Sequence, residues 1–320
     1  MSTYYTSKYS GEEIDEAVRK ILDGEMTGDY ADRQLSNLDT PQAALANLGA
    51  GVRPNELDNP GLCVNQRGQD SYTGNGGEPV TFDRWQAGLH TTIAQNGGNI
   101  VVSASGGAGY ILQRLENPIL GKPIVFSVLI TSGLYECKGV VNSGGSITQE
   151  TPFGAISVTH GARMYALIRL NDGQSITLPV QDGDVAKLEI GDTQTLAYQD
   201  DTGAWQLLPQ PESDYATQLA KCQRYFRRFP ANWSLGGKQT TNAVFEYGLN
   251  PPMRTAPAVS LQNQEDLTVA IDDGVSTITP TAVIFRTVNS QVIEFYFTGI
   301  PSSIQPCIFN KRYLDASADL

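Results

Sequence analysis

The feature that most constrains this chain is a series of short strand-like runs, spaced roughly ten residues apart, between residues 55 and 210. Clusters such as Asn96-Gly97-Gly98 and Asn171-Asp172-Gly173 separate the runs and are typical of tight turns. Many short strands joined by tight turns, with almost no helical periodicity, predict an antiparallel sandwich or jelly roll. The clearest runs are residues 100–104, 110–115, 123–131, 153–158, 163–170, 185–190 and 204–208.

Residues 1–54 depart from this pattern and are expected to be helical. Ser10 and Glu13 form a capping box ahead of an apolar stripe over residues 14–22, and a second helical signal covers residues 40–49. Helices this short are marginal alone in water, so they are expected to pack on a partner subunit or on a copy of the same chain.

Residues 211–320 are expected to form a second β-rich domain, preceded by one helix that begins after Ser213 as N-cap and ends near Pro230. The helix would carry Tyr215, Leu219, Cys222 and Phe226 on one stripe. Strand-like runs follow at residues 243–247, 256–261, 267–271, 281–288, 291–298 and 307–309. The predicted fold is therefore mainly β, with units at 1–54, 55–210 and 211–320.

The charge balance limits the partners. With 22 Lys and Arg against 34 Asp and Glu, the net charge of −12 argues against nucleic acid, whose binders carry a basic excess. No stretch approaches the ~20 apolar residues that span a bilayer, and the polar start at Met1 lacks the apolar core of a secretory signal. We expect a soluble protein made in the cytosol, without membrane insertion.

The sequence contains no motif that predicts catalysis. It has no Gly-x-Ser-x-Gly elbow, no HExxH and no P-loop, and neither of its two histidines, His90 and His160, has a partner at a motif spacing. The four cysteines are too far apart for a zinc or redox motif and are expected to be reduced, mostly buried thiols. They are Cys63, Cys137, Cys222 and Cys307. The chain is not expected to be an enzyme.

Paired aspartates near glycine leave two interpretations open. Asp182 with Asp184, and Asp200 with Asp201, suit ordinary turns, or they could contribute oxygen ligands to a structural Ca²⁺. No other cofactor is expected. The separation of two carboxyl groups in space, on which glycoside hydrolysis depends, is invisible in the sequence.

Aromatic residues are concentrated in the C-terminal third, where residues 211–320 hold 13 of the 27, nearly twice the density of the first 210 residues. Trp233, Tyr247 and Tyr296 could stack on sugar rings, while amide and carboxyl groups take the hydroxyls. The polar neighbours are Asn232, Asn242, Glu246 and Glu294. The alternative is that Trp233 and Tyr247 are core, as the phenylalanines of this region are expected to be; these are Phe285, Phe295, Phe297 and Phe309.

Several segments resemble one family. Residues 34–49, which read Gln-Leu-Ser-Asn-Leu-Asp-Thr-Pro-Gln-Ala-Ala-Leu-Ala-Asn-Leu-Gly, are similar to a segment common in tail-fibre and receptor-binding proteins of tailed bacteriophages and prophages. Residues 54–60, 65–68 and 82–85 resemble the opening of the carbohydrate-binding-like jelly roll of those proteins. Residues 219–226 (Leu-Ala-Lys-Cys-Gln-Arg-Tyr-Phe) and 252–257 resemble their C-terminal segment.

The resemblance implies a homotrimeric, non-enzymatic adhesin at a tail tip of the virion. Residues 1–54 would attach it to tail or baseplate proteins, and the C-terminal domain would contact a bacterial surface polysaccharide. The alternatives are a glycan-degrading tailspike or cell-wall hydrolase, and a purely architectural baseplate subunit. A depolymerase of the usual kind needs a long solenoid with internal repeats, and the sequence shows no repeat period.

Residues 82–85, Phe-Asp-Arg-Trp, also have a structural interpretation, in which the tryptophan and the Asp/Arg pair lock a strand into the sandwich core. If the C-terminal rings do not bind glycan, the surface around Tyr72 and Trp85 is the expected alternative.

Overall fold

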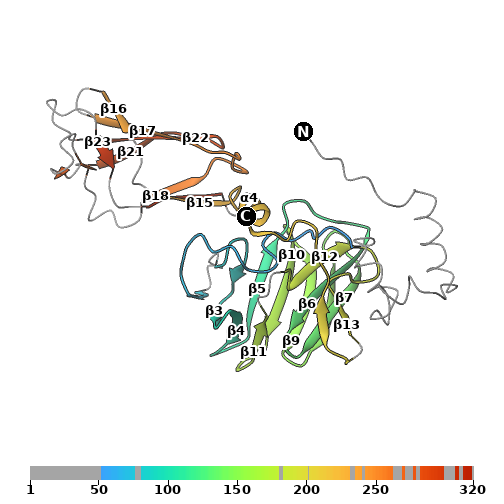
Figure 1. Cartoon of the computed structure of the whole chain (residues 1–320). Coiled ribbons are helices and arrows are strands. Elements are labelled where there is room, and N and C mark those ends of the chain that lie inside the picture. The colour runs from blue at the N-terminus through green and yellow to red at the C-terminus, as the bar shows by residue number, and fades with distance from the viewer. Residues whose placement is uncertain are drawn as a thin grey trace, which may run out of the picture.

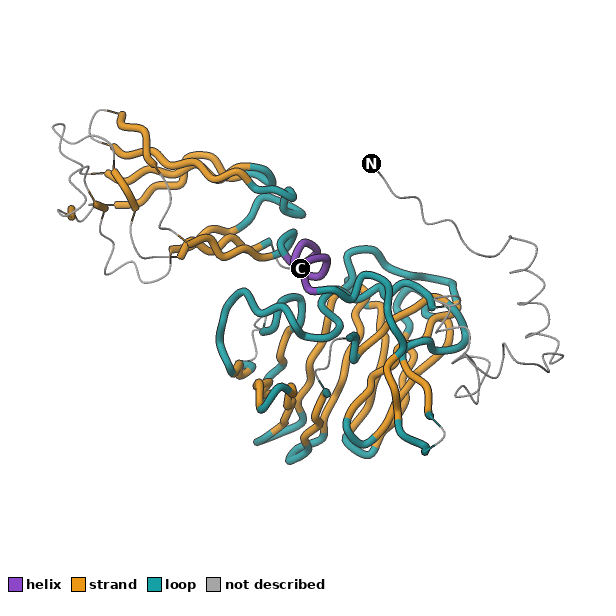
Figure 2. The backbone as a smooth tube through the Cα atoms, viewed as in Figure 1, coloured by secondary structure: helices purple, strands orange, loops and turns teal. Residues whose placement is uncertain are grey.

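The computed structural model describes most of the chain beyond residue 51. The described residues are 52–75, 81–179, 183–200, 202–230, 235–239, 242–261, 269–270, 277–278, 282–298, 307–309 and 313–318. The expected N-terminal helices lie outside them, as do Asp182, Asp201, Asn232 and Trp233. Within this part of the chain the protein is mainly β, with the single helix α4 at Tyr215–Cys222 (Figure 2). In the same part, no helix is long and apolar enough to cross a membrane.

The first unit is a sandwich of antiparallel strands (Figure 1). One layer contains two sheets, β1-β3-β4-β11 and β12-β6-β7. A hydrogen bond from the Thr131 N–H to the Thr177 carbonyl joins these two sheets. The other layer has the order β2-β5-β10-β9-β8. The strands are β1 (Ser71–Thr73), β2 (Gln86–Ala87), β3 (Thr91–Asn96), β4 (Asn99–Ala104), β5 (Gly109–Arg114), β6 (Pro123–Ile130), β7 (Gly133–Val140), β8 (Ser146–Thr151), β9 (Gly154–His160), β10 (Met164–Leu170), β11 (Ser175–Leu178), β12 (Ala186–Ile190), β13 (Ala197–Gln199) and β14 (Trp205–Leu207).

Alternation of apolar and polar residues places the core between these layers. In β4 every second side chain is buried, and β10 follows nearly the same period. Ile93 and Val102 from one layer and Ile111, Ile156 and Ile168 from the other belong to one continuous cluster. The prediction of a mainly β, antiparallel sandwich is confirmed, while the jelly-roll connectivity stays a prediction.

Residues 82–85 form a turn ahead of β2 that carries Trp85 into the core. The Trp85 side chain is fully buried, and its indole N–H donates to the Asn59 carbonyl at 2.9 Å. Asp83 accepts from Arg67 at 3.1 Å. The burial of Trp85 agrees with the structural interpretation of this motif, but Asp83 and Arg84 pair with Arg67 and Asp58 rather than with each other. Tyr72 is also buried and donates its hydroxyl to Asn65, so neither Tyr72 nor Trp85 offers a ring face to a glycan.

The C-terminal part forms two further antiparallel sheets, β15-β24-β18 and β20-β19-β23-β16-β17-β22-β21. Their strands are β15 (Phe226–Pro230), β16 (Leu235–Gln239), β17 (Asn242–Gly248), β18 (Ala258–Leu261), β19 (Val269–Ala270), β20 (Thr277–Ile278), β21 (Ala282–Val288), β22 (Val292–Thr298), β23 (Cys307–Phe309) and β24 (Tyr313–Ser317). In Figure 1 they lie on the far side of α4 from the sandwich.

Two predictions about the helix are wrong. Helix α4 ends at Cys222 rather than near Pro230, because Phe226 begins β15, whose residues pair in unbroken register with β24. The N-cap is Asp214, whose carboxylate accepts the Thr217 N–H at 3.0 Å, whereas the Ser213 hydroxyl donates to the Gln210 carbonyl. A capping side chain accepts from the backbone N–H three residues further along the chain. Asp214 has this spacing from the Thr217 N–H.

Three of the cysteines can be placed. Cys137 and Cys222 are buried free thiols, as expected, and burial raises the pKa of Cys137 to about 12. Cys63 is exposed, which departs from the expected burial, because it lies in the irregular segment that precedes β1.

Candidate functional site

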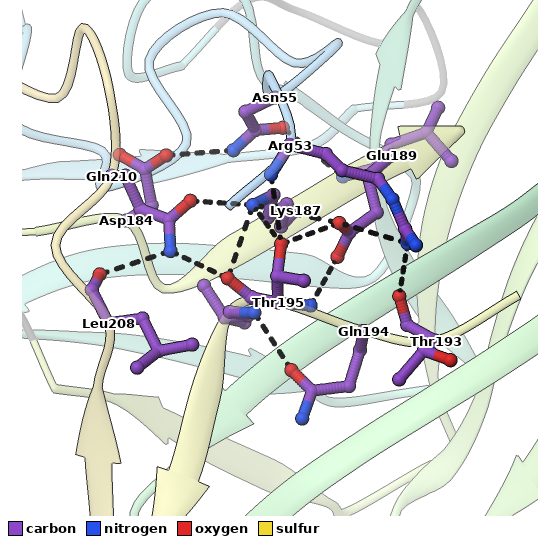
Figure 3. Close-up of polar contacts among 12 residues, drawn as sticks. Arg53, Asn55, Asp184, Lys187, Glu189, Thr193, Gln194, Thr195, Leu208 and Gln210 are labelled. Atoms are coloured by element: carbon purple, nitrogen blue, oxygen red, sulfur yellow. Dashed lines mark hydrogen bonds and ion pairs between the residues drawn. The ribbon is translucent and has the colours of Figure 1, made fainter. Parts of the chain in front are cut away.

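A buried polar network on β12 fixes the chain where it enters and leaves the sandwich (Figure 3). The Lys187 ammonium is fully buried and donates to the Thr195 hydroxyl at 2.7 Å and to the Gln210 side-chain oxygen at 2.6 Å. The buried Glu189 carboxylate lies 3.7 Å from it. Burial lowers the pKa of Lys187 to about 8, although Glu189 opposes the shift.

The same network holds the incoming chain. The Asn55 amide donates to Asp184 at 2.9 Å, and Arg53 donates to the Thr193 carbonyl at 2.7 Å. The Arg53 guanidinium also lies 3.8 Å from Glu189. Residues 53–55 and the segment that leads toward α4 are therefore anchored on one edge of the sandwich.

A second set of contacts joins α4 to the sandwich. The Arg84 guanidinium lies 3.5 Å from the centre of the Tyr225 ring and donates to Asp58 at 3.0 Å. The Tyr225 hydroxyl donates to Glu116 at 2.9 Å, and the buried Gln218 accepts the Asn59 N–H at 2.7 Å. We call these contacts the α4 joint.

The joint extends into the first strand of the C-terminal sheets. The Arg67 guanidinium lies 3.7 Å from the centre of the Phe226 ring, and Gln66 donates to the Phe226 carbonyl at 2.9 Å. Arg228 forms a bidentate pair with Asp315, both contacts at 2.8 Å, which ties β15 to β24. Cation and ring contacts therefore hold the C-terminal sheets on the sandwich.

Sequence reasoning identified residues 82–85 and 219–226 as motifs but not as partners. Arg84 comes from the first motif and Tyr225 from the second, 141 positions apart by their numbers. A signal was present, since Arg84 and Tyr225 are a cation and a ring of the kind that pair in folded proteins. Only the fold shows that they face each other.

The structure divides the predicted glycan-binding residues between two faces of one sheet. Glu246 of β17 lies opposite Glu294 of β22, and Tyr296 lies two residues further along on the same face, opposite the exposed Ile284 of β21. Tyr247 lies on the other face, and its ring centre is 5.3 Å from that of Phe229. Tyr296 and Glu246 are thus brought together, and Tyr247 is separated from them.

The face that carries Tyr296 presents an aromatic ring beside carboxyl groups. Glu246 is exposed and Tyr296 half-buried, so a ring face and carboxylate acceptors lie on neighbouring strands. We call Glu246, Ile284, Glu294 and Tyr296 the β17–β22 face.

Of the paired aspartates that the structure describes, Asp200 orders a turn, whereas Asp184 is a buried carboxylate. Asp200 accepts from the Thr202 hydroxyl at 2.6 Å and from the Ala204 N–H at 2.9 Å, and these bonds lower its pKa to about 2. Asp184 accepts from Asn55. Among the described residues, no three or more His, Cys, Asp or Glu side chains form a group that could hold a metal ion.

Comparison of the chain with family models, with curated proteins and with solved structures gives no match, so the geometry of the site has to carry its interpretation.

We predict that Lys187→Met lowers the free energy of unfolding by about 3–5 kcal/mol, because the buried Glu189 carboxylate loses one of its two cations and the buried Gln210 oxygen loses its donor. Urea denaturation measures the loss. Lys138→Ala, which removes an exposed lysine from a surface pair, is the control and should change stability by less than about 1 kcal/mol. Equal stability of the two variants would show that the network contributes little.

We predict that Arg84→Gly loosens the α4 joint. Arg84 has a φ of 75°, which glycine adopts without strain, so a loss of stability beyond the roughly 0.5–1 kcal/mol that glycine costs through the unfolded chain reports the guanidinium contacts. The expected loss is about 2–4 kcal/mol, with faster proteolytic cleavage between residues 209 and 225. Arg169→Ala, at an exposed ion pair, is the matched control. Unchanged cleavage in Arg84→Gly would contradict the assignment.

Proposed function

We propose that this chain is a non-catalytic, homotrimeric receptor-binding protein at the tail tip of a bacteriophage or a related phage-like particle. In this proposal residues 1–54 attach it to tail or baseplate proteins, and the C-terminal sheets adhere to a bacterial surface polysaccharide. The resemblance of residues 34–49 and 219–226 to tail-fibre proteins supports the assignment to a phage particle. The β17–β22 face, with its aromatic ring and carboxyl groups, supports a polysaccharide as the ligand.

The observation that carries the proposal is the position of the β17–β22 face. The chain enters the sandwich at Arg53 and Asn55 on the β12 edge, whereas the C-terminal sheets extend from the α4 joint. A protein attached through its N-terminal segment would therefore present these sheets on a separate arm (Figure 1). C-terminal sheets placed on such an arm could contact the host cell before the rest of the particle does.

The negative charge of the protein limits which polysaccharides could be its ligand. The net charge is −12, and Glu246 and Glu294 face the same side of the sheet. An acidic polysaccharide would be repelled over a Debye length of about 8 Å at physiological salt. The ligand proposed here is a neutral or amino-bearing glycan, whose hydroxyls or ammonium groups donate to the carboxylates.

One observation favours a second candidate function. Glu246 and Glu294 are direct cross-strand partners, and Cβ atoms at such positions lie about 4.5–5.5 Å apart. Two glutamate side chains that start from such neighbouring positions can place their carboxyl groups about 5–5.5 Å apart, the separation found in retaining glycosidases. A glycan-degrading activity on this face is therefore the alternative to adhesion, and release of reducing ends distinguishes the two.

We predict that Tyr296→Ala weakens adsorption of the full-length protein to host cells about three- to tenfold, the loss expected for one stacked ring. Its melting temperature should change little, because the ring is half-exposed. Tyr165→Ala removes a half-buried ring from β10 of the sandwich and serves as control. If both variants adsorb like the unchanged protein, the β17–β22 face does not bind the glycan.

We predict a trimer in solution. Three copies would raise the effective concentration of weak sugar contacts and give avidity above that of one site. Sedimentation equilibrium should yield about three times the chain mass of 34.6 kDa. A single species at 34.6 kDa would contradict the trimer and remove the avidity argument.

A further inference from the structure

A hollow of about 600 Å³ lies at the edge of the sandwich, between the β13–β14 hairpin and the turn that joins β6 to β7. Ligand pockets commonly have volumes of about 300–1,000 Å³, so a small sugar chain fits this space. The half-buried Trp205 side chain lines it, together with the exposed Thr131, Ser132 and Gln199. Figure 1 shows β13 beside the sandwich strands.

Trp205 is held so that one part of its ring stays open. It packs on a small cluster formed by Leu129, Leu196 and Ala197, separate from the main core. Gln199 lies directly opposite it in the hairpin and therefore on the same face. The ring is thus supported from one side and reachable from the hollow.

Hydrogen bonds order the hairpin around this ring. The Asp200 carboxylate accepts the Thr202 and Ala204 N–H groups at 3.0 and 2.9 Å, and it also accepts from the Gln206 amide at 2.9 Å. Fixing these groups before a ligand arrives lowers the entropy cost of binding. The hairpin is therefore preorganised for ligand binding.

The chemistry of the lining selects one ligand class. None of the described residues that line the hollow carries a charge, although the chain as a whole has a net charge of −12. An aromatic face beside hydroxyl and amide groups matches the apolar face and the hydroxyls of a neutral sugar ring. Phosphates, metal ions and charged peptides would find no counter-charge on these side chains.

We infer that this hollow is a second saccharide subsite, in which a neutral sugar ring stacks on Trp205 while Thr131, Ser132 and Gln199 bond its hydroxyls. The inference deepens the proposed function and rests on it, because it places part of the glycan recognition on the sandwich. It would give each chain two weak contacts, one on each unit, so a long polysaccharide could bridge them.

Saturation-transfer NMR on the full-length protein tests this, with maltotriose, mannotriose and N,N′,N″-triacetylchitotriose as neutral probes. We expect transfer from the protein to at least one trisaccharide, and a dissociation constant at least tenfold higher in Trp205→Ala. Because Trp205 also packs on its cluster, Gln199→Ala, at an exposed position, provides a second variant that should weaken binding without unfolding the hairpin. Tyr165→Ala, in β10 and outside both the hollow and the β17–β22 face, should bind the trisaccharide like the unchanged protein.

The outcomes separate this inference from the proposed function. Host-cell adsorption without transfer to any of the three trisaccharides would overturn the subsite and leave the adhesin proposal standing. Transfer that requires Trp205, in a protein that does not adsorb to cells, would support the subsite and overturn the adhesin proposal. Equal binding by the unchanged protein, Trp205→Ala and Gln199→Ala would overturn the subsite.

Discussion

The Arg84 guanidinium is the contact on which the arrangement of the two units depends. Its side chain is 4% exposed, and it meets the Tyr225 ring, the Asp58 carboxylate and the Arg114 carbonyl. A buried guanidinium is costly unless its donors are satisfied, so removing any partner leaves a charge in a poor environment. The backbone at Arg84 is also in the left-handed region, which the surrounding contacts must stabilise. These conditions hold α4 in one place, and β15 continues from it.

The β12 network has a complementary role. It binds the incoming chain and the outgoing segment to the same edge, so residues 53–55 and the segment around Gln210 are held at one place on the sandwich. Lys187 and Glu189 are both fully buried, and such pairs stabilise less than their Coulomb attraction suggests because both ions lose water. Lys187 and Glu189 instead fix the positions of distant segments, because several polar groups of those segments find hydrogen-bond partners only in this arrangement.

Much of the fold could be predicted from the sequence wherever the local pattern of apolar and turn residues determines the secondary structure. The runs at 100–104, 123–131 and 163–170 correspond closely to β4, β6 and β10, because apolar residues recur there with a short period between turn residues. Strands β7 and β8 carry few buried side chains and gave no such signal. The early end of α4 depends on pairing between β15 and β24, residues far apart in the chain. Local patterns cannot show that contact.

The candidate site shows the same division. Composition identified Tyr247 and Tyr296 as rings in a polar neighbourhood, but only the strand register places them on opposite faces of the sheet. Trp205 was hidden within a strand-like run, and its exposure follows from the hollow beside β6. Ligand surfaces form from residues that the topology brings together, so the sequence narrows their chemistry but not their position.

The most direct test of the central claim, adhesion without catalysis, follows binding and cleavage in one sample. The full-length protein would be incubated with purified envelope polysaccharide from a host that it adsorbs to, while bound polysaccharide and newly formed reducing ends are measured over hours. The account predicts saturable binding with reducing ends at the level of a protein-free control. A steady rise in reducing ends that Glu246→Gln or Glu294→Gln abolishes would contradict it and identify the β17–β22 face as a hydrolytic site.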